Sequence, residues 1–208
     1  VEAELPEAGA ANEANEAFIR ARFLVPEDKD ECAFYNEVSA LMRTLNKKPP
    51  NQSFVILPTL RCNARCVYCY EEGREQRTMS QETVEQTLRY IIQTHKTEPV
   101  AISWFGGEPL LCPDIIDRIC AGLREAGLKY RCAIVSNSSL ITPALIEKMT
   151  GPWNIKHIQV SMDGAEPDYI SRKNYYVYHN YYHSVMDSVS RMSEAGISVT
   201  IRCNVEES

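Results

Sequence analysis

The sequence predicts an α/β fold in which a parallel sheet of five strands is connected by helices. Five short apolar runs alternate with four segments of helical period along residues 53–205. Alternation of this kind produces parallel sheets with right-handed crossovers. In addition, a cysteine-rich segment and a glycine-rich segment each follow one of the apolar runs directly. Functional sites of such folds gather at these carboxyl ends of strands.

The first 52 residues are expected to form an appendage outside this sheet. Residues 1–17 are rich in Ala, Glu and Asn, and we expect them to be poorly ordered. Residues 18–25 alternate well enough for a short strand, and Pro26-Glu27-Asp28 then opens a helix. The apolar residues of this helix recur at helical spacing, so one face is expected to pack: Phe34, Val38, Leu41, Met42 and Leu45.

The apolar runs predict the strands. In residues 53–60, Phe54 to Leu57 are consecutive and show no helical period, as in a strand buried on both faces. The other four strands are expected at residues 100–105, 130–136, 155–162 and 197–205. Since consecutive parallel strands need a crossover between them, the segments that separate these runs should be helical.

The four helices carry start and stop signals. Ser80 can cap a helix that runs to about His95. The second helix begins at Pro113 and ends at Gly127, because proline suits a first turn and glycine a C-terminus. The remaining helices are expected from Thr142-Pro143 to Gly151 and from about Tyr182 to Gly196.

Bulk composition excludes several classes of protein. The 208 residues suffice for one domain with a core, and the net charge of −6 gives no nucleic-acid footprint. We find no apolar run of about 18 residues and no secretory signal, so no membrane partner is expected. The eight cysteines are then expected to be reduced thiols of a cytoplasmic protein.

Three of these cysteines form the densest chemical motif of the chain. Cys62, Cys66 and Cys69 stand at C-x3-C-x2-C spacing directly after the first strand. Clustered thiolates favour an iron–sulfur cluster or zinc. A structural zinc site needs a fourth ligand, which a histidine or another cysteine could supply, whereas a cluster held by three thiolates leaves one iron open. The spacing alone leaves both possibilities open.

A second motif follows the second strand. Gly106 and Gly107 let the backbone approach a ligand closely, and the carboxylate of Glu108 beside them can take an ammonium group. Pro109 completes this Gly-Gly-Glu-Pro segment.

The two motifs together resemble those of the radical S-adenosylmethionine (radical SAM) enzymes. The cysteine motif, with Tyr68 just before the third cysteine, is similar to their cluster motif, and residues 106–109 are similar to the motif at the end of their second strand. The resemblance favours iron over zinc. It implies one 4Fe-4S cluster held by Cys62, Cys66 and Cys69, S-adenosylmethionine as the second cofactor, and a partial (β/α)6 barrel of which this chain supplies five strands.

The resemblance also implies cofactor contacts at the other strand ends. Residues 106–109 would contact the methionine amino group. Ser136-Asn137-Ser138 stands where family members carry Thr-Asn-Gly, so only the hydroxyl of Ser136 and the amide of Asn137 match that pattern. Ser161, in a segment similar to Ser-Leu-Asp-Gly, would bond the ribose or carboxylate of the cofactor, and Asp163 would be structural.

Arg172 is the expected partner of the cofactor carboxylate, because a guanidinium suits bidentate pairing, and Lys173 is its competitor. The tyrosine-rich tract at 175–183 follows directly. It could line a peptide groove or lead into a packed helix.

The resemblance implies reductive cleavage of S-adenosylmethionine to a 5′-deoxyadenosyl radical, which abstracts hydrogen from a substrate. It is closest to the peptide- and protein-modifying maturases of the radical SAM/SPASM type, ribosomal peptide maturases first and anaerobic sulfatase-maturing enzymes second. The implied partners are a peptide or protein substrate and a reduced flavodoxin- or ferredoxin-type electron donor.

Two other interpretations of the function stay open. Residues 53–208 stop before a sixth strand, and the chain begins with Val1, so we expect a fragment of a longer enzyme. A truncated, non-catalytic relative that binds cluster and peptide is the alternative, and a zinc-binding interaction module is a third.

Overall fold

The computed structural model describes residues 30–45, 53–73, 75–96, 98–178 and 180–204. The chain divides into two compact units, Val1–Lys48 and Pro49–Ser208. In the first unit, helix α2 spans Glu31–Leu45, and the Asp30 carboxylate caps it by accepting a hydrogen bond from the Ala33 N–H at 2.8 Å. The strand predicted at residues 18–25 and the boundary predicted at residue 52 lie outside the described residues. Val38 is exposed on α2, so packing of its apolar face stays a prediction.

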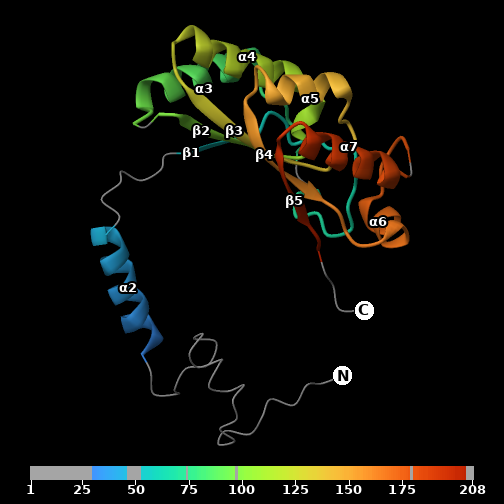
Figure 1. The fold of residues 1–208 in the computed structure, drawn as a ribbon, viewed down its shortest axis with the longest axis horizontal. Coiled ribbons are helices and arrows are strands. Elements are labelled where there is room, and N and C mark those ends of the chain that lie inside the picture. The colour runs from blue at the N-terminus through green and yellow to red at the C-terminus, as the bar shows by residue number, and fades with distance from the viewer. Residues whose placement is uncertain (1–29, 46–52, 74, 97, 179, 205–208) are drawn as a thin grey trace, which may run out of the picture. The chain divides into compact units, whose positions relative to one another are not determined.

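The second unit contains the predicted parallel sheet. Its five strands lie in sequence order, and each pair of neighbours is parallel (Figure 1). The sheet is not closed, since β1 and β5 form its two edges. The strands are β1 (Ser53–Ile56), β2 (Val100–Trp104), β3 (Tyr130–Ser136), β4 (Ile155–Ser161) and β5 (Ser198–Arg202).

The first strand is shorter than its apolar run predicts. Beyond Ile56 the chain leaves the sheet and pairs with residues 77–79, which lie just before the next helix. The Leu60 N–H donates to the Arg77 carbonyl at 2.7 Å, and the Met79 N–H donates to the Pro58 carbonyl at 2.9 Å. The prediction that this strand is buried on both faces is wrong, because Ile56 is 5% exposed whereas Val55 is 60% exposed.

The four predicted helices are confirmed, and Figure 1 shows them along one side of the sheet. Consecutive parallel strands joined by crossovers of one hand place their helices on the same face. Ser80 and Thr142 cap two of them, as predicted, by accepting from the backbone N–H groups of Thr83 and Leu145. The helices are α3 (Gln81–Thr94), α4 (Pro113–Glu125), α5 (Pro143–Thr150) and α7 (Tyr182–Glu194).

Two helical segments were not predicted. The 3-10 helix η1 spans Pro109–Leu111, and the α-helix α6 spans Glu166–Lys173. Of the eight residues in α6, only Tyr169 and Ile170 are apolar, too few to show a helical period. It ends at Asn174, whose φ of 43° is in the left-handed region.

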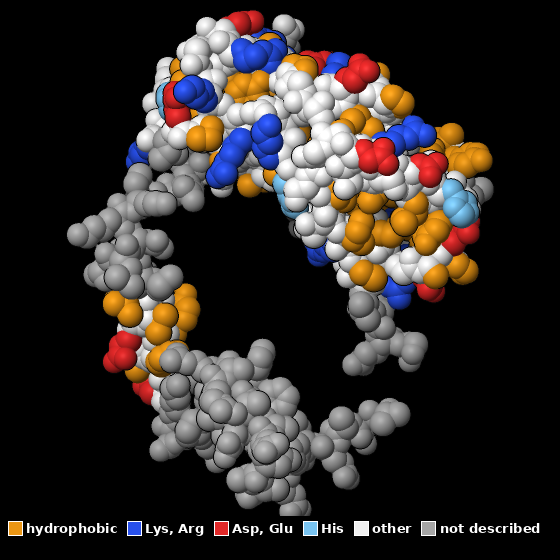
Figure 2. Space-filling model, viewed as in Figure 1, with side chains coloured by type: hydrophobic (Ala, Val, Ile, Leu, Met, Phe, Trp, Pro, Cys, Tyr) orange, Lys and Arg blue, Asp and Glu red, His pale blue; other side chains and the backbone are white. Residues whose placement is uncertain are grey.

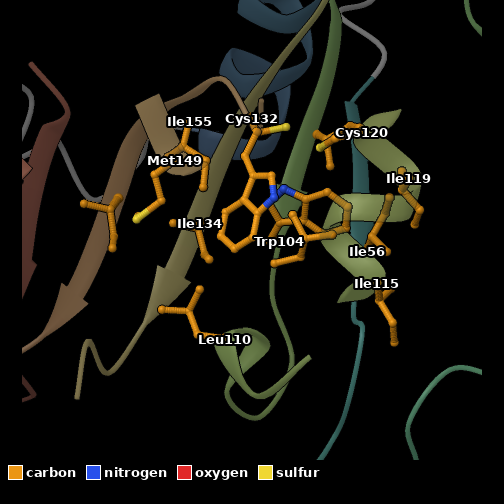
Figure 3. Packing of buried hydrophobic residues seen from close by; sticks show 14 of the residues in the cluster. Ile56, Trp104, Leu110, Ile115, Ile119, Cys120, Cys132, Ile134, Met149 and Ile155 are labelled. Carbon is orange, nitrogen blue, oxygen red and sulfur yellow. The ribbon is translucent and has the colours of Figure 1, made fainter. Parts of the chain in front are cut away.

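The hydrophobic core lies between the sheet and the helices. Alternate residues of each central strand are buried: in β2, Val100, Ile102 and Trp104 point toward the helices, and Ala101 and Ser103 point to the other face. Trp104 is fully buried among side chains from α4, β3 and β4 (Figure 3). No helix among the described residues is long and apolar enough to cross a membrane.

Candidate active site at the carboxyl edge of the sheet

A cavity of about 400 Å³ opens where the parallel strands end. Its walls come from the loop after β1, from the ends of the other four strands, and from Lys173 and Tyr176 between β4 and β5. Residues far apart in the sequence therefore meet there, because the carboxyl ends of parallel strands share one edge. Of the predicted site residues, eight line the cavity: Cys62, Cys66, Cys69, Gly106, Gly107, Ser136, Asn137 and Ser161.

The three predicted cysteine ligands are partly buried free thiols around this cavity. Burial raises the pKa of the Cys62 thiol to about 11. Burial also raises the pKa of Cys66, although the nearby Lys173 ammonium opposes that rise. Among the described residues, no three His, Cys, Asp or Glu side chains converge as a single-ion site requires. Three soft ligands spread around a cavity fit a polynuclear iron–sulfur cluster.

The loop that carries these cysteines is shaped by residues 172–176, which we call the strap. Strap and loop run antiparallel, with a bridge between Ala64 and Tyr175. The hydrogen bonds are made by backbone atoms: Arg65 N–H to the Asn174 carbonyl at 2.9 Å, Val67 N–H to the Arg172 carbonyl at 3.0 Å, and Tyr176 N–H to the Asn63 carbonyl at 3.1 Å. The cysteine loop is thus part of a small two-stranded ladder.

The strap also buries an ionic network beneath the cysteine loop. The Lys173 ammonium donates to the Tyr68 hydroxyl at 2.6 Å and lies 3.1 Å from the Asp163 carboxylate. The Tyr68 hydroxyl in turn donates to the same Asp163 oxygen, Oδ2. The other carboxylate oxygen accepts from the backbone and side-chain N–H groups of Asn204, each at 3.0 Å. The hydroxyl of Tyr68 therefore contacts protein groups.

Charge in this network is well compensated. Burial would raise the pKa of Asp163, but the hydrogen bonds from Tyr68 and Asn204 and the charge of Lys173 lower it below its usual value. The expected structural role of Asp163 fits this arrangement, because its carboxylate ties the end of β4 to the chain after β5.

Glu108 is fully buried, and protein donors occupy both of its oxygens. Its carboxylate accepts from the Ser136 hydroxyl at 2.9 Å, the Asn137 N–H at 2.8 Å and the Leu110 N–H at 3.1 Å. Burial raises its pKa to about 7. In this structure Glu108 joins the ends of β2 and β3, and the expected contact with the cofactor ammonium group stays a prediction.

Gly106 and Gly107 allow the chain after β2 to lie directly against the chain after β1. Gly106 has a φ of 115°, and a Cβ on either glycine would stand 2.3 Å from a backbone oxygen, that of Thr59 or Arg61. The N–H groups of Gly107 and Glu108 donate to these same oxygens at 3.1 and 2.9 Å. The glycine motif thus braces the backbone that leads into the cysteine loop.

The remaining predicted residues lie around this centre. The Asn137 amide donates to Asn63 Oδ1 at 2.8 Å and to Cys62 Sγ at 3.8 Å. Ser161 lines the cavity beside Arg202, its in-register neighbour on β5. Pro109 starts η1 and is buried.

Lys173 lines the cavity, whereas Arg172 supplies a backbone carbonyl to the cysteine loop. Sequence reasoning considered Lys173 only as a competitor for the cofactor carboxylate, and it did not find the strap. The sequence carries no local signal for it, because the helix that ends at Lys173 has too few apolar residues to show a period.

Comparison with known proteins places this site in a family. The model of the radical SAM superfamily matches residues 56–205. An uncharacterised protein of Methanocaldococcus jannaschii is 29% identical over 140 residues, covering 66% of this chain and 46% of the relative. A probable GTP 3′,8-cyclase of Methanothermobacter marburgensis is 30% identical over 138 residues, covering 62% of this chain and 42% of the relative.

An AdoMet-dependent heme synthase of Methanosarcina barkeri is 28% identical over 110 residues, covering 53% of this chain and 30% of the relative. The chain thus spans less than half the length of these curated relatives.

Solved structures share the fold. The structure of anSMEcpe with bound AdoMet has a TM-score of 0.64 at 18% identity and covers 73% of this chain and 43% of that one. The structure of Streptococcus suis SuiB bound to its precursor peptide SuiA has a TM-score of 0.58 at 18% identity. The match covers 94% of this chain and 45% of SuiB. The fold, the open parallel sheet and the family match agree with the resemblance read from the two motifs. The chain belongs to the radical SAM superfamily.

Proposed function

We propose that this chain is the catalytic core of a radical SAM enzyme that acts on a peptide or protein. The observation that carries the proposal is the cavity itself, where Cys62, Cys66 and Cys69 face the ends of the other strands. When bound there, a 4Fe-4S cluster and S-adenosylmethionine supply reductive cleavage of the sulfonium to a 5′-deoxyadenosyl radical.

The residues of the chain position these groups. The three thiols would hold the cluster, and Gly106 and Gly107 let the chain after β2 support the backbone that leads into the cysteine loop. Ser161 lines the same cavity and would supply a hydroxyl to polar groups of the cofactor, while the Asn137 amide holds the cysteine loop through Asn63 and Cys62. Holding the reacting atoms in one geometry while excluding water is the contribution of the protein to such chemistry.

Two observations support a peptide substrate. Both anSMEcpe and SuiB, which share this fold, have been solved with bound peptides. At the cavity wall, the half-exposed Tyr176 holds its hydroxyl 2.7 Å from Arg65 Nε and so offers an aromatic face with a polar tip. Aromatic surfaces of this kind are enriched where proteins bind peptides. Figure 2 shows further hydrophobic side chains at the surface over α6 and α7.

Iron content and cofactor cleavage test the cluster. The full chain is purified without oxygen, reconstituted with iron and sulfide, and assayed for 5′-deoxyadenosine with S-adenosylmethionine and dithionite. About four irons per chain are expected, with both iron and product lost in Cys66→Ala. Cys112→Ala is the matched control, because Cys112 is a partly buried free thiol that does not line the cavity. Zinc in place of iron, or equal effects of the two variants, would contradict the assignment.

A substrate comparison tests the peptide. The reconstituted chain is given a tryptic peptide pool or GTP, and the rate of 5′-deoxyadenosine formation is measured with each. We expect the peptide pool alone to stimulate cleavage. Stimulation by GTP would instead favour the activity named for one of the sequence relatives. A full complement of iron with no cleavage under any condition would favour a non-catalytic relative.

A further inference from the structure

Lys173 and Asp163 form a buried ion pair to which the proposed function assigns no role. Their side chains are 2% and 0% exposed, and the ammonium nitrogen lies 3.1 Å from the carboxylate oxygen. Removing two charges from water costs several kcal/mol for each ion, and well-packed apolar residues are often equally stabilising. Stability alone therefore does not account for the pair.

The two charges of the pair are placed differently with respect to the cavity. Lys173 lines the cavity together with Cys66 and Cys69, whereas the far oxygen of Asp163 is bound to Asn204. Asp163 itself is not among the residues that line the cavity. The positive end of the pair therefore faces the thiols.

The ammonium group is held in place from two sides. Tyr68, which stands between the second and third cysteines, accepts a hydrogen bond from it at 2.6 Å and places its ring 5.3 Å away. On the other side, the carbonyls of Arg172 and Asn174, which flank Lys173, are bound by the cysteine loop. The backbone on both sides of Lys173 is thus hydrogen-bonded to the loop that carries the cysteines.

We propose that Lys173 is a positioning residue that sets the reduction potential of the cluster held by Cys62, Cys66 and Cys69, an inference that rests on the proposed function. Reduction adds one electron to a group that already carries the negative charge of its thiolates. A cation fixed nearby in a site of low dielectric favours the reduced form, so Lys173 raises the potential. Asp163, at the far end of the pair, limits that rise.

A redox titration of the reconstituted full chain tests this inference. Dithionite supplies the electron as it is oxidised to sulfite, and the visible absorbance and the paramagnetic resonance signal of the cluster report its reduction. Lys173→Met is expected to move the midpoint to a more negative potential. Asp163→Asn, which leaves the cation without its counter-charge, is expected to move the midpoint in the opposite direction.

Lys156→Met is the matched control, since it removes the same charge from an exposed lysine near the start of β4. Its midpoint should equal that of the unmodified chain. If Lys173→Met does not keep its cluster, Lys173→Gln, which retains a donor for Tyr68, must show the same shift of the midpoint to a more negative potential. Asp163→Asn tests the inference independently, because its midpoint must shift to a more positive potential.

Equal midpoints in the Lys173 and Lys156 variants, or shifts of one sign in the Lys173 and Asp163 variants, would overturn the inference and leave the proposed function intact. Failure of the unmodified chain to take up about four irons would instead refute the proposed function itself.

Discussion

At the scale of single residues, Glu108 shows how burial and hydrogen bonding compete. Its carboxylate accepts three protein hydrogen bonds, each of which favours the ionised form, yet it is fully buried, and burial raises its pKa from 4.5 to about 7. The folded protein therefore holds a proton that the unfolded chain releases more readily. This contribution to stability is complete below pH 4.5 and is lost as the pH rises through about 7.

We expect Glu108→Gln to remove this pH dependence, because glutamine cannot ionise. Between pH 4.5 and 7 the free energy of unfolding of the unmodified chain should fall relative to that of the variant, by about 3 kcal/mol in all, at about 1.4 kcal/mol per pKa unit. Urea denaturation at several pH values measures the difference. Glu125→Gln, on the exposed end of α4, is the control and should follow the unmodified chain. Parallel curves for Glu108→Gln and the unmodified chain would show that folding does not raise the pKa of Glu108.

At the scale of elements, the strap is the segment that gives the cysteine loop its shape. It depends on packing behind it: Tyr175 is 2% exposed, its hydroxyl lies 2.7 Å from that of Tyr169 on α6, and its ring lies 4.7 Å from that of Tyr181. The tyrosine-rich tract therefore packs, as one of its two predictions holds, and a peptide groove along it stays a prediction. Tyr175 and Tyr181 pack inward, while Tyr176 reaches the cavity.

Tyr175→Ala is expected to destabilise the strap. Loss of a buried aromatic side chain should lower the free energy of unfolding by about 3–5 kcal/mol. Tyr178→Ala is the matched control, because Tyr178 is 62% exposed, and it should cost at most about 1 kcal/mol. Urea denaturation of the chain before reconstitution measures both changes. Equal costs for the two substitutions would mean that the strap is not anchored by Tyr175.

At the scale of the whole molecule, the order of elements and the two motifs follow from the sequence alone. Apolar runs alternate with capped helical segments, so the strands and the four longer helices could be placed to within a few residues, and the site to the carboxyl edge of the sheet. The cysteine spacing and the Gly-Gly-Glu-Pro segment identified the family, because thiol ligands and close backbone approach require specific residue types at specific spacings.

Tertiary structure decided how these motifs are supported. Whether Glu108 faces the cavity or the protein depends on donors at the end of β3, which the local sequence does not reveal. The strap pairs with a loop about 110 residues earlier in the chain, as the Arg65–Tyr176 hydrogen bond illustrates. Likewise, the sequence suggests Lys173 only as a competitor of Arg172 for the cofactor carboxylate, whereas the fold buries it beside Asp163. Such long-range contacts carry no local periodicity, because they depend on which strand ends the fold brings together.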